Sequence, residues 1–257
     1  MDYIKKFDNV TSFQRYVERG TPNKLFALPA DQSSQEKDFG FNGTKSWEDA
    51  QTLLRGGDKE SLELLQKSLG KVNMKGSGTY TRRRLKTSVV GFVPHISNYL
   101  QGKPDCMINI TQEKITSPKV INILYNPTVS YGVSKDFIAD GGAKILSFLR
   151  KLESQGYRVN LFVVCASQKN RERCAILVKI KSSDQHLDLI KVAYPLVNPS
   201  MLRRHFLRYI EVSDVTDYNW VHSYGVPIKE KSTILQLFPT LRVDYYYTCD
   251  DANDLVL

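Results

Sequence analysis

The sequence has no long apolar run and no close pair of cysteines. One of its longest apolar runs, 161–166, is far shorter than the roughly 20 residues that a membrane-spanning helix needs. The N-terminus has no apolar segment of the kind found in a secretory signal peptide. The cysteines (Cys106, Cys165, Cys174 and Cys249) form no C-x-x-C pair, the usual sign of zinc or thioredoxin-type chemistry. We therefore exclude the membrane, disulfide-rich secreted and collagen-like classes, and expect a soluble cytoplasmic protein.

The common catalytic and phosphate-binding motifs are also missing. The four histidines show no H-x-x-x-H spacing, and the chain contains no G-x-x-x-x-G-K-[ST] loop. One pair, Cys106 with His95 upstream, has the residue types of a nucleophile and its base. A cysteine beside Met107, at the start of an apolar run, is more often a small core residue. We therefore predict no enzymatic activity, no cofactor and no bound metal ion.

The composition is that of a folded, basic protein. The 257 residues are 41% hydrophobic and 25% charged, with a net charge of +9, which suits a globular chain with a sizeable core. Residue patterns divide the chain into four stretches. They are a helical N-terminal region (1–70), a basic and partly flexible connector (71–103), an α/β core (104–210) and a C-terminal appendage with an acidic tail (211–257).

The stretch 104–210 has the clearest pattern. Apolar, β-branched runs predict strands at 119–125, 157–166 and 174–180, and an apolar stripe at helical spacing predicts a long helix over 135–155. A strand, a crossover helix and a second strand imply a βαβ unit. The expected fold class is therefore α/β, with a mostly parallel sheet and flanking helices, preceded by a helical N-terminal region.

Further elements are expected on either side of the βαβ unit. Ser46 starts a helix that ends at Gly56-Gly57, since it precedes two acids in the first turn. Two helices are predicted at 187–193 and 200–209. The run Tyr245-Tyr246-Tyr247 predicts a strand near the C-terminus.

The loop after the first strand resembles the D-x-S-x-S metal loop of von Willebrand factor A-like domains. Asn126, Thr128 and Ser130 fall on its three positions, and a helix and a strand follow. The resemblance implies a divalent cation beside a long helix, but asparagine replaces the aspartate, and Mg²⁺ prefers carboxylate oxygens. No Thr-Asp-Gly triplet follows to supply another acid. We therefore predict a von Willebrand A-like core whose loop is degenerate, either a metal-free relic or a plain Asx/ST turn.

A second resemblance covers roughly residues 45–210. The tryptophan-led helix from Ser46 to Gly56, the Y-L-x-G-x-P-x-C-M piece within 97–107 and the βαβ unit are together similar to an uncharacterised family of bacteriophage proteins. The resemblance implies residence in the bacterial host cytoplasm or in a virion, and a protein partner from one of them. It implies no chemistry.

Two basic clusters are candidates for binding nucleic acid. One lies in the connector and the other on the helix predicted at 200–209: Lys71, Lys75, Arg82, Arg83, Arg84 and Lys86, and Arg203, Arg204 and Arg208. Clusters of this kind neutralise phosphates, and two that share one surface would support binding. The alternative is a solvated linker and an ordinary charged helix face.

Two functional hypotheses follow from these patterns. The first is a non-catalytic, phage-type interaction or virion-associated protein built on a degenerate von Willebrand A-like core. The second is a nucleic-acid-binding protein that uses residues 71–86 and the face of Arg203 to Arg208.

Overall fold

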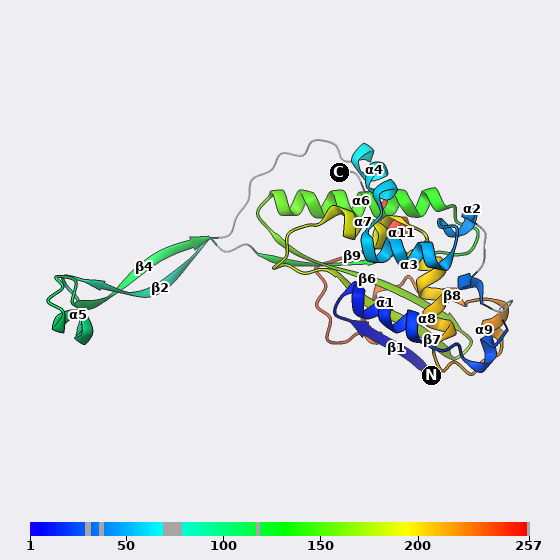
Figure 1. The fold of residues 1–257 in the computed structure, drawn as a ribbon, viewed down its shortest axis with the longest axis horizontal. Coiled ribbons are helices and arrows are strands. Elements are labelled where there is room, and N and C mark those ends of the chain that lie inside the picture. The colour runs from blue at the N-terminus through cyan, green and yellow to red at the C-terminus, as the bar shows by residue number, and fades with distance from the viewer. Residues whose placement is uncertain (29–31, 36–38, 69–78, 117–118, 256–257) are drawn as a thin grey trace.

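The computed structural model describes residues 1–28, 32–35, 39–68, 79–116 and 119–255. Its body is a six-stranded sheet flanked by helices (Figure 1), with strand order β1-β7-β6-β5-β9 and β8 beside β6. The pairs β1–β7, β5–β6 and β5–β9 are parallel, whereas β7 and β8 run antiparallel to β6. The strands are β1 (Asp2–Phe7), β5 (Val120–Asn126), β6 (Arg158–Lys169), β7 (Glu172–Lys181), β8 (Val226–Pro227) and β9 (Tyr245–Thr248).

The predicted α/β class with a mostly parallel sheet is confirmed, and the four central elements begin and end within a few residues of their predicted bounds. The helical elements of the body are α1 (Val10–Arg19), η1 (Lys24–Phe26), η3 (Ser33–Gln35), α2 (Phe39–Asn42), α3 (Trp47–Gly56), α4 (Lys59–Ser68), α6 (Lys135–Ser154), α7 (Leu189–Val197), the π-helix η4 (Met201–Phe206), α8 (Leu207–Glu211), α9 (Asn219–His222), α10 (Lys231–Leu237) and α11 (Cys249–Asn253). No helix in these described ranges is long and apolar enough to cross a membrane.

The sheet separates two apolar cores because successive side chains of a strand point to opposite faces. In β5, Ile123 and Tyr125 belong to the larger core, together with buried residues of α1, α3, α6 and α7. Leu124 lies between them in sequence and belongs to the smaller core, which α10 covers through Ile234 and Leu237. Both faces of the central strands are therefore buried, which explains their continuous apolar runs.

Helices α6 and α7 pack closely over the larger core. A β-carbon added at Gly142 of α6 would lie 2.0 Å from the carbonyl oxygen of Leu196 in α7. Because real β-carbons do not approach a carbonyl oxygen so closely, only glycine fits at this contact.

Residues 79–116 form an arm with a sheet of its own. Strand β2 (Thr79–Ser88) pairs antiparallel with β4 (Met107–Thr116), and β3 (Val93–Pro94) pairs with the start of β4. The short helix α5 (Ile96–Leu100) lies at the end of this ribbon, and the arm extends away from the body (Figure 1). The predicted boundary between a connector and a core at residue 103 is wrong, because β2 and β4 lie on either side of it and pair along their whole length.

The two ends of the chain also differ from the expectation. Residues 1–70 were expected to be helical, but Asp2–Phe7 is an edge strand beside β7. The expected appendage 211–257 supplies β8 and β9 to the central sheet, and its acidic residues Asp250 and Asp251 start helix α11. The predicted strand at Tyr245–Tyr247 is confirmed as β9.

Candidate functional sites

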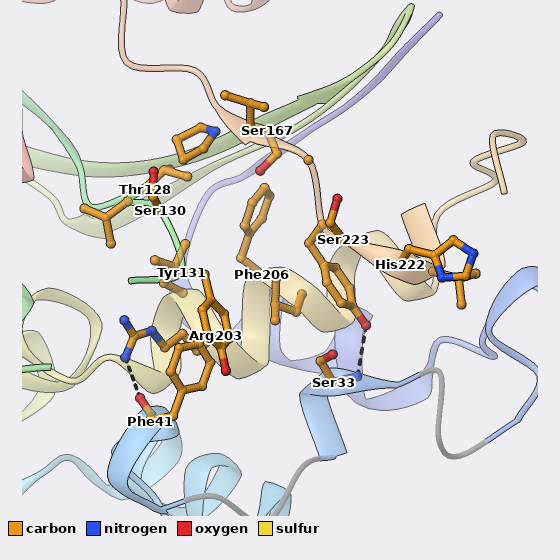
Figure 2. A pocket seen from close by; sticks show the side chains of 18 residues that line it. Ser33, Phe41, Thr128, Ser130, Tyr131, Ser167, Arg203, Phe206, His222 and Ser223 are labelled. Atoms are coloured by element: carbon orange, nitrogen blue, oxygen red, sulfur yellow. Dashed lines mark hydrogen bonds between the residues drawn. The ribbon is translucent and has the colours of Figure 1, made fainter. Parts of the chain in front are cut away.

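A cavity of about 520 Å³ lies where strands β5 and β6 end. Its wall includes Thr128 and Ser130 from the loop after β5, Ser167 near the end of β6, and Phe206 of the π-helix (Figure 2). Parallel strands of α/β sheets commonly present their ligand sites at the carboxyl ends. The cavity therefore occupies the place where this fold class carries a site, and two of the three predicted loop residues line it.

Within that loop, Asn126 and Thr128 form hydrogen bonds to the protein. Asn126 is fully buried; its Nδ2 donates to the carbonyl oxygen of Ile228 (2.8 Å) and to the hydroxyl of Tyr246 (3.0 Å). Its Oδ1 accepts from the backbone N–H of Thr128 (3.1 Å), which is an Asx turn. Thr128 Oγ1 accepts from the backbone N–H of Ala166 (3.1 Å). The loop thus has the geometry of the Asx turn, one of the two forms predicted for it.

Ser130, the third residue of the predicted metal loop, is exposed and takes no part in the hydrogen bond between Asn126 and Thr128. Across the parts of the chain that the structure describes, no cluster of three or more His, Cys, Asp or Glu side chains could hold a metal ion. No Asp or Glu is among the described residues that line the cavity with Thr128 and Ser130, so the side chains there do not fit a Mg²⁺ ion at Asn126, Thr128 and Ser130.

Replacing Asn126 by Asp is expected to destabilise the fold without creating a cation site. A carboxylate would face the carbonyl oxygen of Ile228, which now accepts a hydrogen bond from the Asn126 amide. Two buried acceptors left without a donor cost about 1–3 kcal/mol. Urea unfolding of Asn126→Asp and its titration with Mn²⁺ check this. The exposed cap substitution Asn9→Asp is the control, because Asp also accepts from the N–H of Ser12. Saturable Mn²⁺ binding that stabilises Asn126→Asp would contradict the expectation.

The opposite wall of the cavity is the segment 221–227, which a buried carboxylate holds in place. Glu172 of β7 accepts from the N–H and hydroxyl of Thr216, the N–H of Asp217 and the indole N–H of Trp220 (2.9 Å). Burial acts to raise the pKa of Glu172, but these hydrogen bonds outweigh burial and leave the pKa lowered. The ionised carboxylate therefore fixes the chain just before the residues that line the cavity.

The three arginines predicted to bind nucleic acid from the helix at 200–209 are buried: Arg203, Arg204 and Arg208. The prediction that these arginines form an exposed binding face is therefore wrong. Arg204 donates to the hydroxyl and carbonyl oxygens of Thr44 and to the carbonyl oxygen of Ser34. Their physical role is to cross-link the π-helix and α8 to the N-terminal segments.

Arg208 pairs with a buried carboxylate next to the cavity. Its Nη1 lies 3.3 Å from Oε2 of Glu211, which is itself fully buried. Glu211 also accepts from the N–H (3.0 Å) and hydroxyl (2.5 Å) of Ser34, and from the hydroxyl of Tyr224 (2.7 Å). Tyr224 and Ser33 line the cavity, so this network holds part of the cavity wall.

The sequence pattern carries no signal for this burial. At about 100° per residue, one half of the helix carries Met201, Leu202, Phe206, Tyr209 and Ile210, and the other half carries the three arginines. This is the pattern of an amphipathic helix with a solvated charged face, so the burial follows only from the segments that pack over that face.

The first basic cluster belongs to the arm or lies outside the described residues. Lys71 and Lys75 fall outside them. Lys86 is exposed in β2. Arg82, Arg83 and Arg84 are consecutive residues of β2, but their side chains are not among those described. No shared surface with Arg203, Arg204 and Arg208 forms, since those three are buried.

The cysteine–histidine pair also lies on the arm. The backbone N–H of His95 donates to the carbonyl oxygen of Cys106 (2.7 Å). The His95 ring caps helix α5 by accepting at Nδ1 from the N–H of Asn98 (3.3 Å). These contacts hold the end of the arm together, and the cap occupies a ring nitrogen that a general base would need.

The end of the arm carries an exposed apolar patch. It consists of seven large hydrophobic residues that come from three segments between Ser88 and Gln101: Val89, Val90, Phe92, Val93, Ile96, Tyr99 and Leu100. Exposure ranges from 44% for Val93 to 78% for Leu100. Contiguous apolar patches on a folded protein commonly mark an interaction surface. Sequence reasoning placed a short strand and a helical turn here but missed the patch, because residue type alone does not show exposure.

Comparison with known proteins identifies one family. The model of a domain of unknown function (DUF7192) matches residues 1–252. No curated protein sequence and no solved structure matches the chain significantly. The matched range includes both the body and the arm. The chain therefore belongs to the DUF7192 family.

Proposed function

We propose that the protein is a non-catalytic interaction protein that docks onto a protein partner through the apolar tip of its arm. The observation that carries this proposal is the patch of seven exposed hydrophobic side chains at residues 89–100. Burying such side chains is a main driving force of protein association, and a central apolar cluster commonly supplies most of the binding energy.

The tip is held in a defined shape before any partner binds. Thr87 Oγ1 donates to the carboxylate of Asp105 (3.1 Å), and the amide of Asn98 donates to the Asp105 carbonyl oxygen (3.1 Å). At Gly91, a β-carbon would lie 2.2 Å from the carbonyl oxygen of Ile108, so the loop packs tightly on β4. A preformed surface loses little conformational entropy on binding, which favours affinity.

Charge distribution indicates what kind of partner fits. Residues 88–102 contain no Lys, Arg, Asp or Glu, whereas the whole arm 79–116 has six basic residues against two acidic ones. A nucleic-acid contact would need cations at the tip itself. The pattern instead fits a protein groove that is apolar inside and acidic at its rim, where it would meet the basic ribbon behind the tip.

The finer sequence resemblances belong to this proposal. The order β5, loop, α6, β6 and the spacing of Asn126, Thr128 and Ser130 support a von Willebrand A-like core with a degenerate loop. The phage-like motifs support a partner from a virion or from the infected bacterial host, and residence of the protein there.

Substituting Asp for both Ile96 and Leu100 is expected to weaken partner binding at least about 30-fold, because each loses roughly 1–2 kcal/mol of buried apolar contact. Both side chains are exposed, at 70% and 78%, so the free energy of unfolding should change by less than about 0.5 kcal/mol. The control variant, Leu28→Asp with Tyr218→Asp, adds the same charge to two exposed apolar positions of the body and should leave binding unchanged.

The protein partner whose affinity is compared between these variants is identified by photo-crosslinking at two matched tyrosines. A benzophenone amino acid replaces Tyr99 at the tip in one sample and Tyr218 of the body in another; the two are 67% and 60% exposed. We expect one protein adduct from position 99 that disappears in the Ile96→Asp, Leu100→Asp background. Equal adducts from both positions, or undiminished affinity of the purified partner for the double variant, would overturn the proposal.

Nucleic-acid binding is the second candidate, favoured by the four basic residues that strand β2 contains: Arg82, Arg83, Arg84 and Lys86. Glu113 lies opposite Arg82 in the backbone register of β2 and β4. Salt titrations with random single- and double-stranded DNA and RNA separate the two candidates. Affinity that falls steeply with salt and is abolished by Arg82→Glu with Arg84→Glu would favour nucleic acid.

A further inference from the structure

The side chain of Arg203 is a buried cation without a carboxylate partner among the residues that the structure describes. Only 4% of Arg203 is exposed, and it lines the cavity at the ends of β5 and β6. Two of its N–H groups donate to the backbone carbonyl oxygens of Phe41 (2.6 Å) and Val133. A guanidinium has five N–H donors. The two carbonyl oxygens accept from two of them, and the other three have no acceptor among the residues that the structure describes.

Two other buried cations, Lys181 and Arg208, are paired with carboxylates among the described residues. The ammonium group of Lys181 lies 2.6 Å from the carboxylate of Glu153, and Arg208 pairs with Glu211. Arg203 has instead the face of the Phe41 ring, whose centre lies 3.9 Å from the guanidinium carbon, and the Tyr131 ring packs at a tilt against Phe41 (Figure 2). Burial lowers the pKa of Arg203. A buried charge with this incomplete compensation is unfavourable unless an anion joins it.

The other residues that line the cavity indicate the chemistry of the uncharged part of that anion. Val129, Leu202, Phe206, Val221 and Val226 make much of its wall apolar, and no Asp or Glu is among the described residues that line it. A volume of about 520 Å³ falls within the range of roughly 300–1,000 Å³ typical of small-molecule sites. Arg203 alone supplies a permanent positive charge, which suits one negative charge rather than the nearly two of a phosphate monoester.

We propose that this cavity binds a small monocarboxylate whose apolar chain lies against the valines, leucine and phenylalanine while its carboxylate pairs with Arg203. The carboxylate would take the N–H groups that the protein leaves unused, in the charge-assisted geometry that guanidinium and carboxylate favour. Hydroxyls of Ser130 and Ser167 lie on the wall of the same cavity and could accompany it. This site is separate from the arm, so it does not depend on the proposed docking function.

Titration calorimetry of the full chain with octanoate tests this site. We expect saturable binding of octanoate, and binding of octan-1-ol and of acetate that is about 10- to 100-fold weaker, because octanol lacks the charge and acetate lacks the chain. Arg203→Met should weaken octanoate binding by a similar factor and leave octanol binding unchanged. Equal affinities for octanoate and octanol, or no saturable octanoate binding, would overturn the proposal.

Arg203→Met also removes the hydrogen bonds to Phe41 and Val133, so a measurement on the unmodified chain is needed as well. Methyl NMR during the octanoate titration should shift the signals of Val129, Leu202 and Val226. The methyl signals of Leu237, on the other face of the sheet, should stay in place. Shifts confined to residues outside the cavity would refute the site even if octanoate binds.

Discussion

Replacing Glu211 by Ala is expected to lower the free energy of unfolding by about 3–5 kcal/mol, because it leaves the buried Arg208 guanidinium without its counter-ion. Glu211 is fully buried and accepts from Ser34, Tyr224 and Arg208. All these donors lose their acceptor together. The loss is a large fraction of the roughly 5–15 kcal/mol that stabilises a typical domain. Urea unfolding at neutral pH measures it.

A matched exposed pair provides the control for Glu211→Ala. Glu18 lies 3.3 Å from Arg55, and both side chains are largely in solvent, so Glu18→Ala should cost less than about 0.5 kcal/mol. Glu211→Gln keeps the size of the side chain and should fall between the two. A cost below about 1 kcal/mol for Glu211→Ala would show that the Glu211 network does not hold the fold together.

Lowering the pH from 6.5 to 4 is expected to remove about 3 kcal/mol of stability through His205 alone. Burial of this residue lowers its pKa from 6.5 to about 4, an effect that the hydrogen bond to Ser200 opposes and the nearby Arg204 charge reinforces. Its Nδ1 lies 3.1 Å from the Ser200 carbonyl oxygen, and its Nε2 has no hydrogen-bond partner among the residues that the structure describes. The imidazole is therefore neutral in the folded protein at pH 7.

The sign of the His205 effect follows from where protons bind. Between pH 6.5 and 4 the unfolded chain protonates this histidine while the folded chain does not, so acid favours unfolding. The full contribution is present above pH 6.5 and is lost as the pH falls towards 4. Glu172, whose pKa is lowered from 4.5, acts in the same direction at lower pH. The interval from 6.5 to 4.5 therefore isolates the histidine.

Free energies of unfolding measured at every half pH unit between pH 6.5 and 4.5 test the prediction. His205→Phe keeps an aromatic ring against Trp47 and Tyr194 and should flatten the pH dependence there. The exposed His222 is the matched control, and His222→Phe should leave the slope unchanged. An unchanged slope in His205→Phe would mean that another group causes the acid sensitivity.

Local pattern was sufficient to predict the central elements. The apolar run at 119–125 predicts a buried strand, and the apolar stripe over 135–155 predicts a helix. The structure places both within a few residues of the prediction. The start of helix α3 at Ser46 was also predictable from the sequence. The Ser46 hydroxyl accepts from the N–H of Asp49, three residues later. Short-range periodicity and capping depend only on neighbours in the chain.

The candidate sites needed the tertiary structure because residues far apart in sequence build them. Arg203 and Arg208 carry the same charge as solvent-exposed arginines, and only the packing around the π-helix decides that they are buried. Strand β1 mixes charged and apolar residues, buries only Phe7, and becomes a strand through its pairing with β7. The sequence by itself determined the α/β class and the Asn126 turn, because these follow from local periodicity and hydrogen bonding. The cavity, the exposed tip and the buried ion pairs were decided only by the tertiary structure, because burial depends on contacts between distant segments.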